Sequence, residues 1–108
     1  MIAGGSGITP FLQILNMFHL EQTSAPTCSV VYGNKSINDI WLKSELEKFK
    51  SKSIKLEYAL EKCDSSWLGH VGQISSKILE TTIERPCSSH LVFYCGPPAM
   101  NNHVKNIL

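Results

Sequence analysis

The feature that most constrains this fold is a regular alternation of two kinds of segment along the chain. Short apolar runs, at residues 1–3, 28–32, 54–60 and 90–95, are typical of strands. The segments between them carry apolar residues at helical spacing. Strands separated by helices favour parallel pairing through right-handed crossovers. We therefore expect an α/β fold, with a Rossmann-like parallel sheet in a three-layer αβα arrangement.

Local signals mark where the first two helices begin. Pro10 suits the first position of a helix, and Thr9 before it is able to cap that helix. A second helix is expected over residues 37–49, with Ser36 as its cap and Asp39 in its first turn. Each of these helices directly follows an expected strand.

The second half of the chain continues the pattern. A third helix is expected from a cap at Ser75 or Ser76 to Ile83, and a last helix at the C-terminal end. Residues 54–60 alternate between apolar and polar side chains, which predicts an edge strand. Residues 90–95 form a fully apolar run, which predicts a buried strand.

The composition limits the classes of partner. At 108 residues the chain is long enough for one domain, 1–108, with one core. Its net charge of +1 argues against nucleic acid. Charged residues make up 18%, below the roughly 25% of average proteins, which predicts that part of the surface is covered by a partner lobe.

The chain shows no sign of a membrane span or an export signal. No apolar run approaches the roughly 18 residues that a membrane helix needs. Residues 1–20 lack the basic leader and cleavage pattern of a signal peptide. We expect a cytoplasmic location, or one on the cytosolic face of a membrane through segments outside this chain.

The cysteines give no pattern of a metal site or a disulfide framework. They are widely separated, with no C-x-x-C pair and no close histidine: Cys28, Cys63, Cys87 and Cys95. Such spacing fits reduced thiols in a cytosolic setting. The histidines share no spacing that suggests a metal or a catalytic triad, so we expect no bound metal.

The stretch "AGGSGITP" places a glycine-rich turn between the first strand and the first helix. Glycine lets a ligand approach the main chain, and exposed amides at a helix start attract anions, which favours a phosphate over Gly4, Gly5, Ser6 and Gly7. The alternative is a tight turn without a ligand. The spacing matches neither the P-loop nor the Rossmann G-x-G-x-x-G motif.

A second segment, Cys95-Gly96-Pro97-Pro98, directly follows the last expected strand. The two prolines remove backbone donors and fix the chain direction, which leaves a narrow, rigid shelf able to hold a flat ring. The alternative is a structural cysteine before a helix that begins with proline. In a parallel sheet, both segments lie at the carboxyl ends of strands, where ligands bind.

Three segments together, "AGGSGITP", "VYGNKSINDIWLKSELEKF" and "LVFYCGPPAM", resemble the ferredoxin-NADP reductase superfamily, closest to its cytochrome b5 reductase and nitrate reductase branch. The resemblance is to the C-terminal NAD-binding lobe and covers nearly the whole chain. It implies a flavoprotein oxidoreductase that takes a hydride from NADH onto FAD. Electrons then pass singly to a haem protein such as cytochrome b5 or to an iron–sulfur acceptor.

The resemblance also implies roles for residues of the two turns. Cys95 is the catalytic candidate that positions the nicotinamide, and Thr9 is a second catalytic candidate. The cofactor-binding candidates of these segments are Gly4, Gly5, Ser6, Gly7, Thr9, Pro10, Gly96, Pro97, Pro98 and Met100. Orientation would be their task, because the cofactors perform the hydride chemistry.

Four further cofactor-binding candidates belong to the adenosine side: Tyr32, Asn34, Asp39 and Glu61. Glu61 stands where NADP-using relatives place a Ser-Arg pair, and its carboxylate repels a 2′-phosphate, which favours NADH. The alternatives are a core position for Tyr32, a helix-dipole role for Asp39 and a solvated position for Glu61. Trp67 is expected to be a packing residue.

The segments that hold flavin in this superfamily, an R-x-Y-[ST] stretch and a second glycine motif of an antiparallel barrel, do not occur in the chain. We expect a nucleotide lobe truncated at both ends and inactive alone, with the FAD-binding barrel supplied in cis by a longer chain. The competing hypothesis is a non-catalytic nucleotide-binding or interaction module derived from such a lobe.

Overall fold

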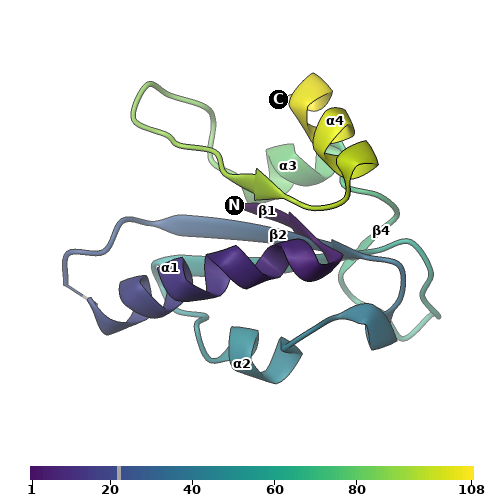
Figure 1. The fold of residues 1–108 in the computed structure, drawn as a ribbon, viewed down its shortest axis with the longest axis horizontal. Coiled ribbons are helices and arrows are strands. Elements are labelled where there is room, and N and C mark those ends of the chain that lie inside the picture. The colour runs from purple at the N-terminus through teal and green to yellow at the C-terminus, as the bar shows by residue number, and fades with distance from the viewer. Residues whose placement is uncertain (22) are drawn as a thin grey trace.

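The computed structural model describes residues 1–21 and 23–108, and it is built on one parallel sheet (Figure 1). Its five strands lie in the order β4-β3-β2-β1-β5, and all four pairings are parallel. The strands are β1 (Ile2–Gly4), β2 (Cys28–Asn34), β3 (Ile54–Leu60), β4 (His70–Val71) and β5 (Tyr94–Cys95). The expected parallel α/β sheet is confirmed.

Helices cover both faces of the sheet (Figure 1). One face carries the 3₁₀ helix η1 (Gly5–Ile8), α1 (Thr9–Leu20), the 3₁₀ helix η2 (Ile37–Asp39) and α2 (Lys43–Glu47). The other carries α3 (Ser76–Thr82) and α4 (Pro98–Ile107). This is the expected three-layer αβα arrangement. None of the helices in the described ranges is long and apolar enough to cross a membrane.

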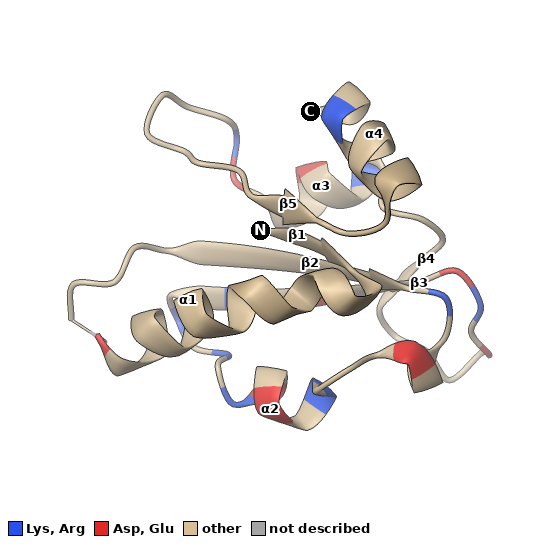
Figure 2. Cartoon of the chain, in the orientation of Figure 1, with Lys and Arg blue, Asp and Glu red and all other residues tan. Residues whose placement is uncertain are grey.

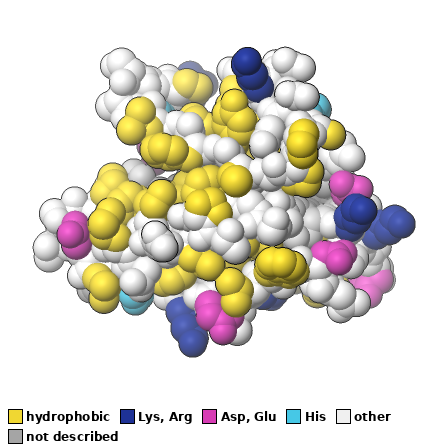
Figure 3. Space-filling model, viewed as in Figure 1, with side chains coloured by type: hydrophobic (Ala, Val, Ile, Leu, Met, Phe, Trp, Pro, Cys, Tyr) yellow, Lys and Arg dark blue, Asp and Glu magenta, His cyan; other side chains and the backbone are white. Residues whose placement is uncertain are grey.

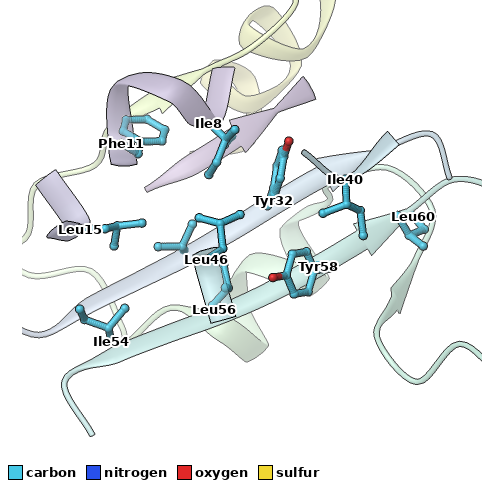
Figure 4. Close-up of a cluster of buried hydrophobic side chains, with 12 residues drawn as sticks. Ile8, Phe11, Leu15, Tyr32, Ile40, Leu46, Ile54, Leu56, Tyr58 and Leu60 are labelled. Atoms are coloured by element: carbon cyan, nitrogen blue, oxygen red, sulfur yellow. The ribbon is translucent and has the colours of Figure 1, made fainter. Parts of the chain in front are cut away.

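The two cores follow from the period of two along the strands. Successive side chains of a strand point to opposite faces. Val30 and Tyr32 of β2 therefore join the α1 side, whereas Val31 joins the α3 side. Figure 4 shows the larger core, in which Leu46 of α2 and Leu15 of α1 approach the side chains of β2 and β3.

The strand register brings the strand ends to one edge. Gly4 pairs with Gly33 across β1 and β2, and Ala3 pairs with Cys95 across β1 and β5. Asn34 pairs with Leu60 at the ends of β2 and β3. The segments that follow these strands therefore all leave from the same edge, as the parallel topology predicted.

The helix expected over residues 37–49 is interrupted, so that expectation was wrong in its middle. Ile40 is extended, with ψ of 102°, and buried, while Leu42 is left-handed, with φ of 56°. The break turns Ile40 into the core ahead of Leu46, and η2 and α2 remain on either side. Burial of Ile40 thus overrides the helical periodicity of the segment.

Leu42→Gly is expected to stabilise the chain by about 0.5–1 kcal/mol, because a left-handed residue with a Cβ is strained and glycine is not. Leu42 is 42% exposed, and the expected net gain includes the loss of the buried part of its side chain. Urea unfolding measures the change. Leu42→Ala keeps the strain and serves as the control; an equal gain in both variants would remove the argument.

The C-terminal strand is much shorter than expected and lies at the edge of the sheet. β5 pairs with β1 only through Tyr94 and Cys95, and Ile2 N–H also donates to the Phe93 carbonyl at 2.7 Å. Leu91 and Phe93 are exposed at 80% and 48%. The prediction of a buried strand over residues 90–95 is therefore wrong, since only one side of β5 has a described neighbour.

The remaining expectations about element ends are partly met. Ser75 caps α3 by accepting the Ile78 N–H at 3.4 Å, as expected. Thr9 is not a cap but the first residue of α1. β3 is an edge strand only in its first part, because β4 pairs with Ala59 and Leu60.

Candidate functional site

The glycine turn, residues 4–7, passes directly beneath the start of the shelf, residues 95–98. Gly7 is buried, and a Cβ there would overlap the Cys95 carbonyl and lie 2.8 Å from the Gly96 nitrogen. Gly5 has φ of +53°, a left-handed conformation that glycine adopts without strain. Two segments almost ninety residues apart thus touch through their backbones, as expected of segments that leave neighbouring strands at one edge of the sheet.

Met100 fills the space between the glycines of the turn and the shelf. A Cβ on Gly4 would overlap its sulfur, and a Cβ on Gly96 would lie 2.9 Å from the same atom. Pro97 stands at the N-cap of α4 and Pro98 at its first position. Both prolines are exposed, so the shelf offers a rigid apolar surface beside Cys95.

Asn101 is a residue of this site that the sequence did not identify. Its side-chain Nδ2 donates to the Gly96 carbonyl at 2.9 Å, one helical turn after Pro97. The bond fixes the Gly96–Pro97 peptide of the shelf. A short amide in the first turn of a helix is the signal that could have indicated this contact, because such side chains bond to nearby backbone groups.

Tyr32 lies under the glycine turn and not at the surface of the site. The residue is fully buried, and its hydroxyl donates to the Gly5 carbonyl at 2.9 Å. The same oxygen accepts the Trp41 N–H at 3.3 Å. Burial raises the pKa of the hydroxyl, so it remains a donor at neutral pH. Of the two interpretations of Tyr32, the structure supports the core position.

Asn34, at the carboxyl end of β2, has an unsatisfied side chain. The residue is 8% exposed, and neither its Nδ2 nor its Oδ1 has a hydrogen-bond partner among the described residues. Buried amides normally find partners. A polar group arriving at this end of β2 would satisfy it, so the position fits a ligand with hydroxyl groups.

Asp39 and Glu61 differ in their availability. The Asp39 carboxylate accepts both the N–H and the hydroxyl of Ser36, at 3.0 and 2.7 Å, and closes its own turn. Glu61 is exposed directly after β3, and its N–H donates to the Asn34 carbonyl at 3.1 Å. Its carboxylate accepts from Gln73 Nε2 at a long 3.4 Å. Glu61, but not Asp39, is therefore free to face a ligand beside Asn34.

Thr9 and Pro10 are exposed at the start of α1. The Thr9 hydroxyl donates to the Ser6 carbonyl at 2.8 Å, which stabilises the turn from within.

Trp67 packs edge-to-face on Tyr58, with ring centroids 6.4 Å apart, and its ring N–H donates to the His70 carbonyl at 3.0 Å. The packing interpretation of Trp67 is confirmed.

The turn and the shelf carry no charged side chain. Residues 4–10 and 95–100 contain no lysine, arginine, aspartate or glutamate, and Figure 2 shows α1 and β1 free of both colours of charge. An anion bound here would depend on backbone N–H groups and on the N-terminus of α1. Among the described residues, no group of three metal-ligating side chains is found.

Residues 1–106 match the family of the oxidoreductase NAD-binding domain. The chain belongs to this family. NADH-cytochrome b5 reductase 1 of Kluyveromyces lactis is 36% identical to it over 108 residues, covering 97% of the chain and 38% of the relative. The chain thus spans less than half of the length of this relative, and the resemblance seen in the sequence is confirmed.

Solved structures give the same result for this NAD-binding domain. The cytochrome b5 reductase domain of Ulva prolifera nitrate reductase superposes with a TM-score of 0.88 at 25% identity, over 99% of this chain and 43% of that one. The CS-b5R domains of human Ncb5or, in an NAD+ form, superpose with a TM-score of 0.76 at 30% identity, over 98% and 31%. The fold class inferred from the sequence is confirmed.

Proposed function

We propose that the chain is the NADH-binding half of an FAD-dependent reductase. One observation carries the proposal: Gly7 lies against the Cys95 carbonyl, so the turn and the shelf form one continuous wall at the carboxyl edge of the sheet. The nicotinamide would lie beside Cys95 on the shelf, and the adenosine half would extend toward Asn34 and Glu61.

The residues present fit this dinucleotide at both ends. At the nicotinamide end, Gly5 leaves its backbone uncovered, and Met100 and Asn101 hold the shelf in place. At the other end, the unsatisfied Asn34 amide offers a donor and an acceptor for ribose hydroxyls. A bound nicotinamide would supply the hydride, and the residues of the turn and the shelf would orient it.

The rest of the enzyme is proposed from the relatives. An FAD-binding barrel in cis would complete the active site, and the name of the Kluyveromyces relative favours a haem protein such as cytochrome b5 over an iron–sulfur protein as electron acceptor. Figure 3 shows hydrophobic side chains gathered over α1 and beside the segment that leads into β5. The exposed hydrophobic residues include Met17, Leu20 and Leu91, which supports coverage of this surface by a partner lobe.

We propose that this reductase lies in the cytoplasm or on a cytosolic membrane face.

Calorimetric titration of the chain with NADH and NADPH tests the nucleotide assignment. We expect NADH to bind weakly and NADPH more weakly still, because Glu61 repels a 2′-phosphate. Glu61→Ser is expected to reduce the NADH preference by about five-fold, as the loss of roughly 1 kcal/mol of charge repulsion implies.

Glu57→Ser is the matched control, since it removes the same charge from β3 before the carboxyl edge. It should leave the preference unchanged. Equal affinities of the parent for both nucleotides would remove the role of Glu61, and no binding of either nucleotide would contradict the proposed function. Binding of NADH without reductase activity in a longer chain that holds the barrel would favour the non-catalytic module.

A further inference from the structure

The Tyr32 hydroxyl joins the glycine turn of the proposed nucleotide site to the loop at Trp41. We propose that Tyr32 is a positioning residue, which sets the direction of the Gly5–Ser6 peptide and couples the glycine turn to the loop at Trp41. This inference rests on the proposed function for its effect on NADH, but the positioning itself is a property of the free chain. Tyr32 is fully buried and therefore acts without touching the nucleotide.

The first step of the argument concerns the peptide that Tyr32 holds. Its hydroxyl donates to the Gly5 carbonyl, which must therefore point toward the core. In a trans peptide the carbonyl and the following N–H point in opposite directions. The Ser6 N–H is thus directed away from the core, at the edge where the nucleotide would bind. Ser6 itself is exposed.

The second step concerns why such a bond is needed. Gly5 has φ of +53° and no neighbour within 4 Å of a Cβ position, so no side-chain packing holds its conformation. Glycine visits many backbone conformations at similar cost. The hydrogen bond from Tyr32 adds to the backbone bonds of η1 and favours one of them, since the hydroxyl is anchored by a ring packed in the core.

The third step concerns the other partner of the hydroxyl. The Trp41 N–H donates to it at 3.3 Å, between the extended Ile40 and the left-handed Leu42. One oxygen thus serves the turn on β1 and the loop that follows β2. A displacement of either segment weakens the bond to the other, which couples the glycine turn and the loop at Trp41 through a single atom.

Tyr32→Phe tests the inference, with Tyr58→Phe as matched control. Tyr58 is also a mostly buried tyrosine of the same sheet, but its hydroxyl donates to Glu47 at 2.9 Å, away from the turn. In ¹H–¹⁵N spectra of the free chain, we expect the Gly5, Ser6 and Trp41 amides to shift and broaden in Tyr32→Phe. Tyr58→Phe should leave these three signals in place.

The NADH titration supplies the functional readout. Tyr32→Phe should bind NADH about five-fold more weakly than the parent, the effect of one hydrogen bond, while Tyr58→Phe binds like the parent. If the parent binds no NADH but the amides of the turn still respond to Tyr32→Phe, the proposed function fails and the positioning stands. If those amides respond equally in both variants or in neither, the inference is overturned.

A measurement on the parent covers the case in which Tyr32→Phe does not fold. A buried hydroxyl that donates to a carbonyl exchanges its proton slowly with solvent. The Tyr32 hydroxyl proton should therefore be visible by NMR, with cross-peaks to the turn. Exchange as fast as that of a solvent-exposed tyrosine would show that the bond to Gly5 is absent.

Discussion

Gly7→Ala is expected to destabilise the chain by about 3 kcal/mol and to weaken NADH binding at least about ten-fold. The new methyl group would overlap the Cys95 carbonyl and approach the Gly96 nitrogen to 2.8 Å. Both obstacles are backbone, so the turn and the shelf must separate to accommodate it. Urea unfolding gives the change in stability, and calorimetry gives the affinity for NADH.

Gly33→Ala is the matched control, on the neighbouring strand. Its Cβ would lie 3.1 Å from the Ile74 Cδ1, the far end of a flexible side chain. We expect a change of less than about 1 kcal/mol, since the neighbour is a side chain and not backbone, and alanine also reduces the entropy of the unfolded chain. A Gly7→Ala variant as stable as Gly33→Ala would show that turn and shelf are not in contact.

Leu46→Ala is expected to reduce the free energy of unfolding by about 3 kcal/mol, within the range measured for buried leucines. Leu46 is 0% exposed, and it is the buried residue of the five-residue helix α2. Figure 4 shows it pointing into the core toward β3. So short a helix depends on this anchor, because isolated helices of this length are not stable in water.

Hydrogen exchange would follow the same variant residue by residue. The amides of α2 should lose more protection than those of α1 if Leu46 anchors α2 alone. Leu68→Ala is the control, because Leu68 is 97% exposed and its truncation should leave stability unchanged. A loss below about 1 kcal/mol for Leu46→Ala would mean that α2 is held by other contacts.

The layers of the fold and the meeting of the two candidate segments could be predicted from the sequence because both follow from local patterns. Period-two and helical spacing alternate clearly, and a parallel sheet has only one edge where the segments after its strands can meet. Gly4 to Gly7 and Cys95 to Pro98 were found in this way. Their contact follows from β1 lying next to β5.

What could not be predicted depends on tertiary contacts. The apolar spacing of residues 37–49 is helical, yet Ile40 enters the core and breaks the helix. The length of β5 depends on how much of β1 faces it, which its own apolar sequence does not reveal. The bond from Asn101 to Gly96 likewise requires the actual course of the chain after Pro97.

Tertiary contacts also decide which candidate residues of the site remain available to a ligand. The family resemblance suggested a ligand contact for Tyr32, but its place in the strand period turns it into the core, where its hydroxyl donates to the Gly5 carbonyl. Asp39 was a candidate by position, but its carboxylate is used by Ser36. Only coordinates show which polar groups are already satisfied, as the unpartnered amide of Asn34 illustrates.

The thioether of Met100, seated between Gly4 and Gly96, makes this junction sensitive to oxidants. Conversion to the sulfoxide adds an oxygen and a strong dipole to a sulfur that lies close to both glycines. The added atom would push the first strand and the last helix apart at the place where the nicotinamide is proposed to lie. Methionine sulfoxide reductases reverse that lesion, so damage at this position would be repairable without resynthesis of the protein.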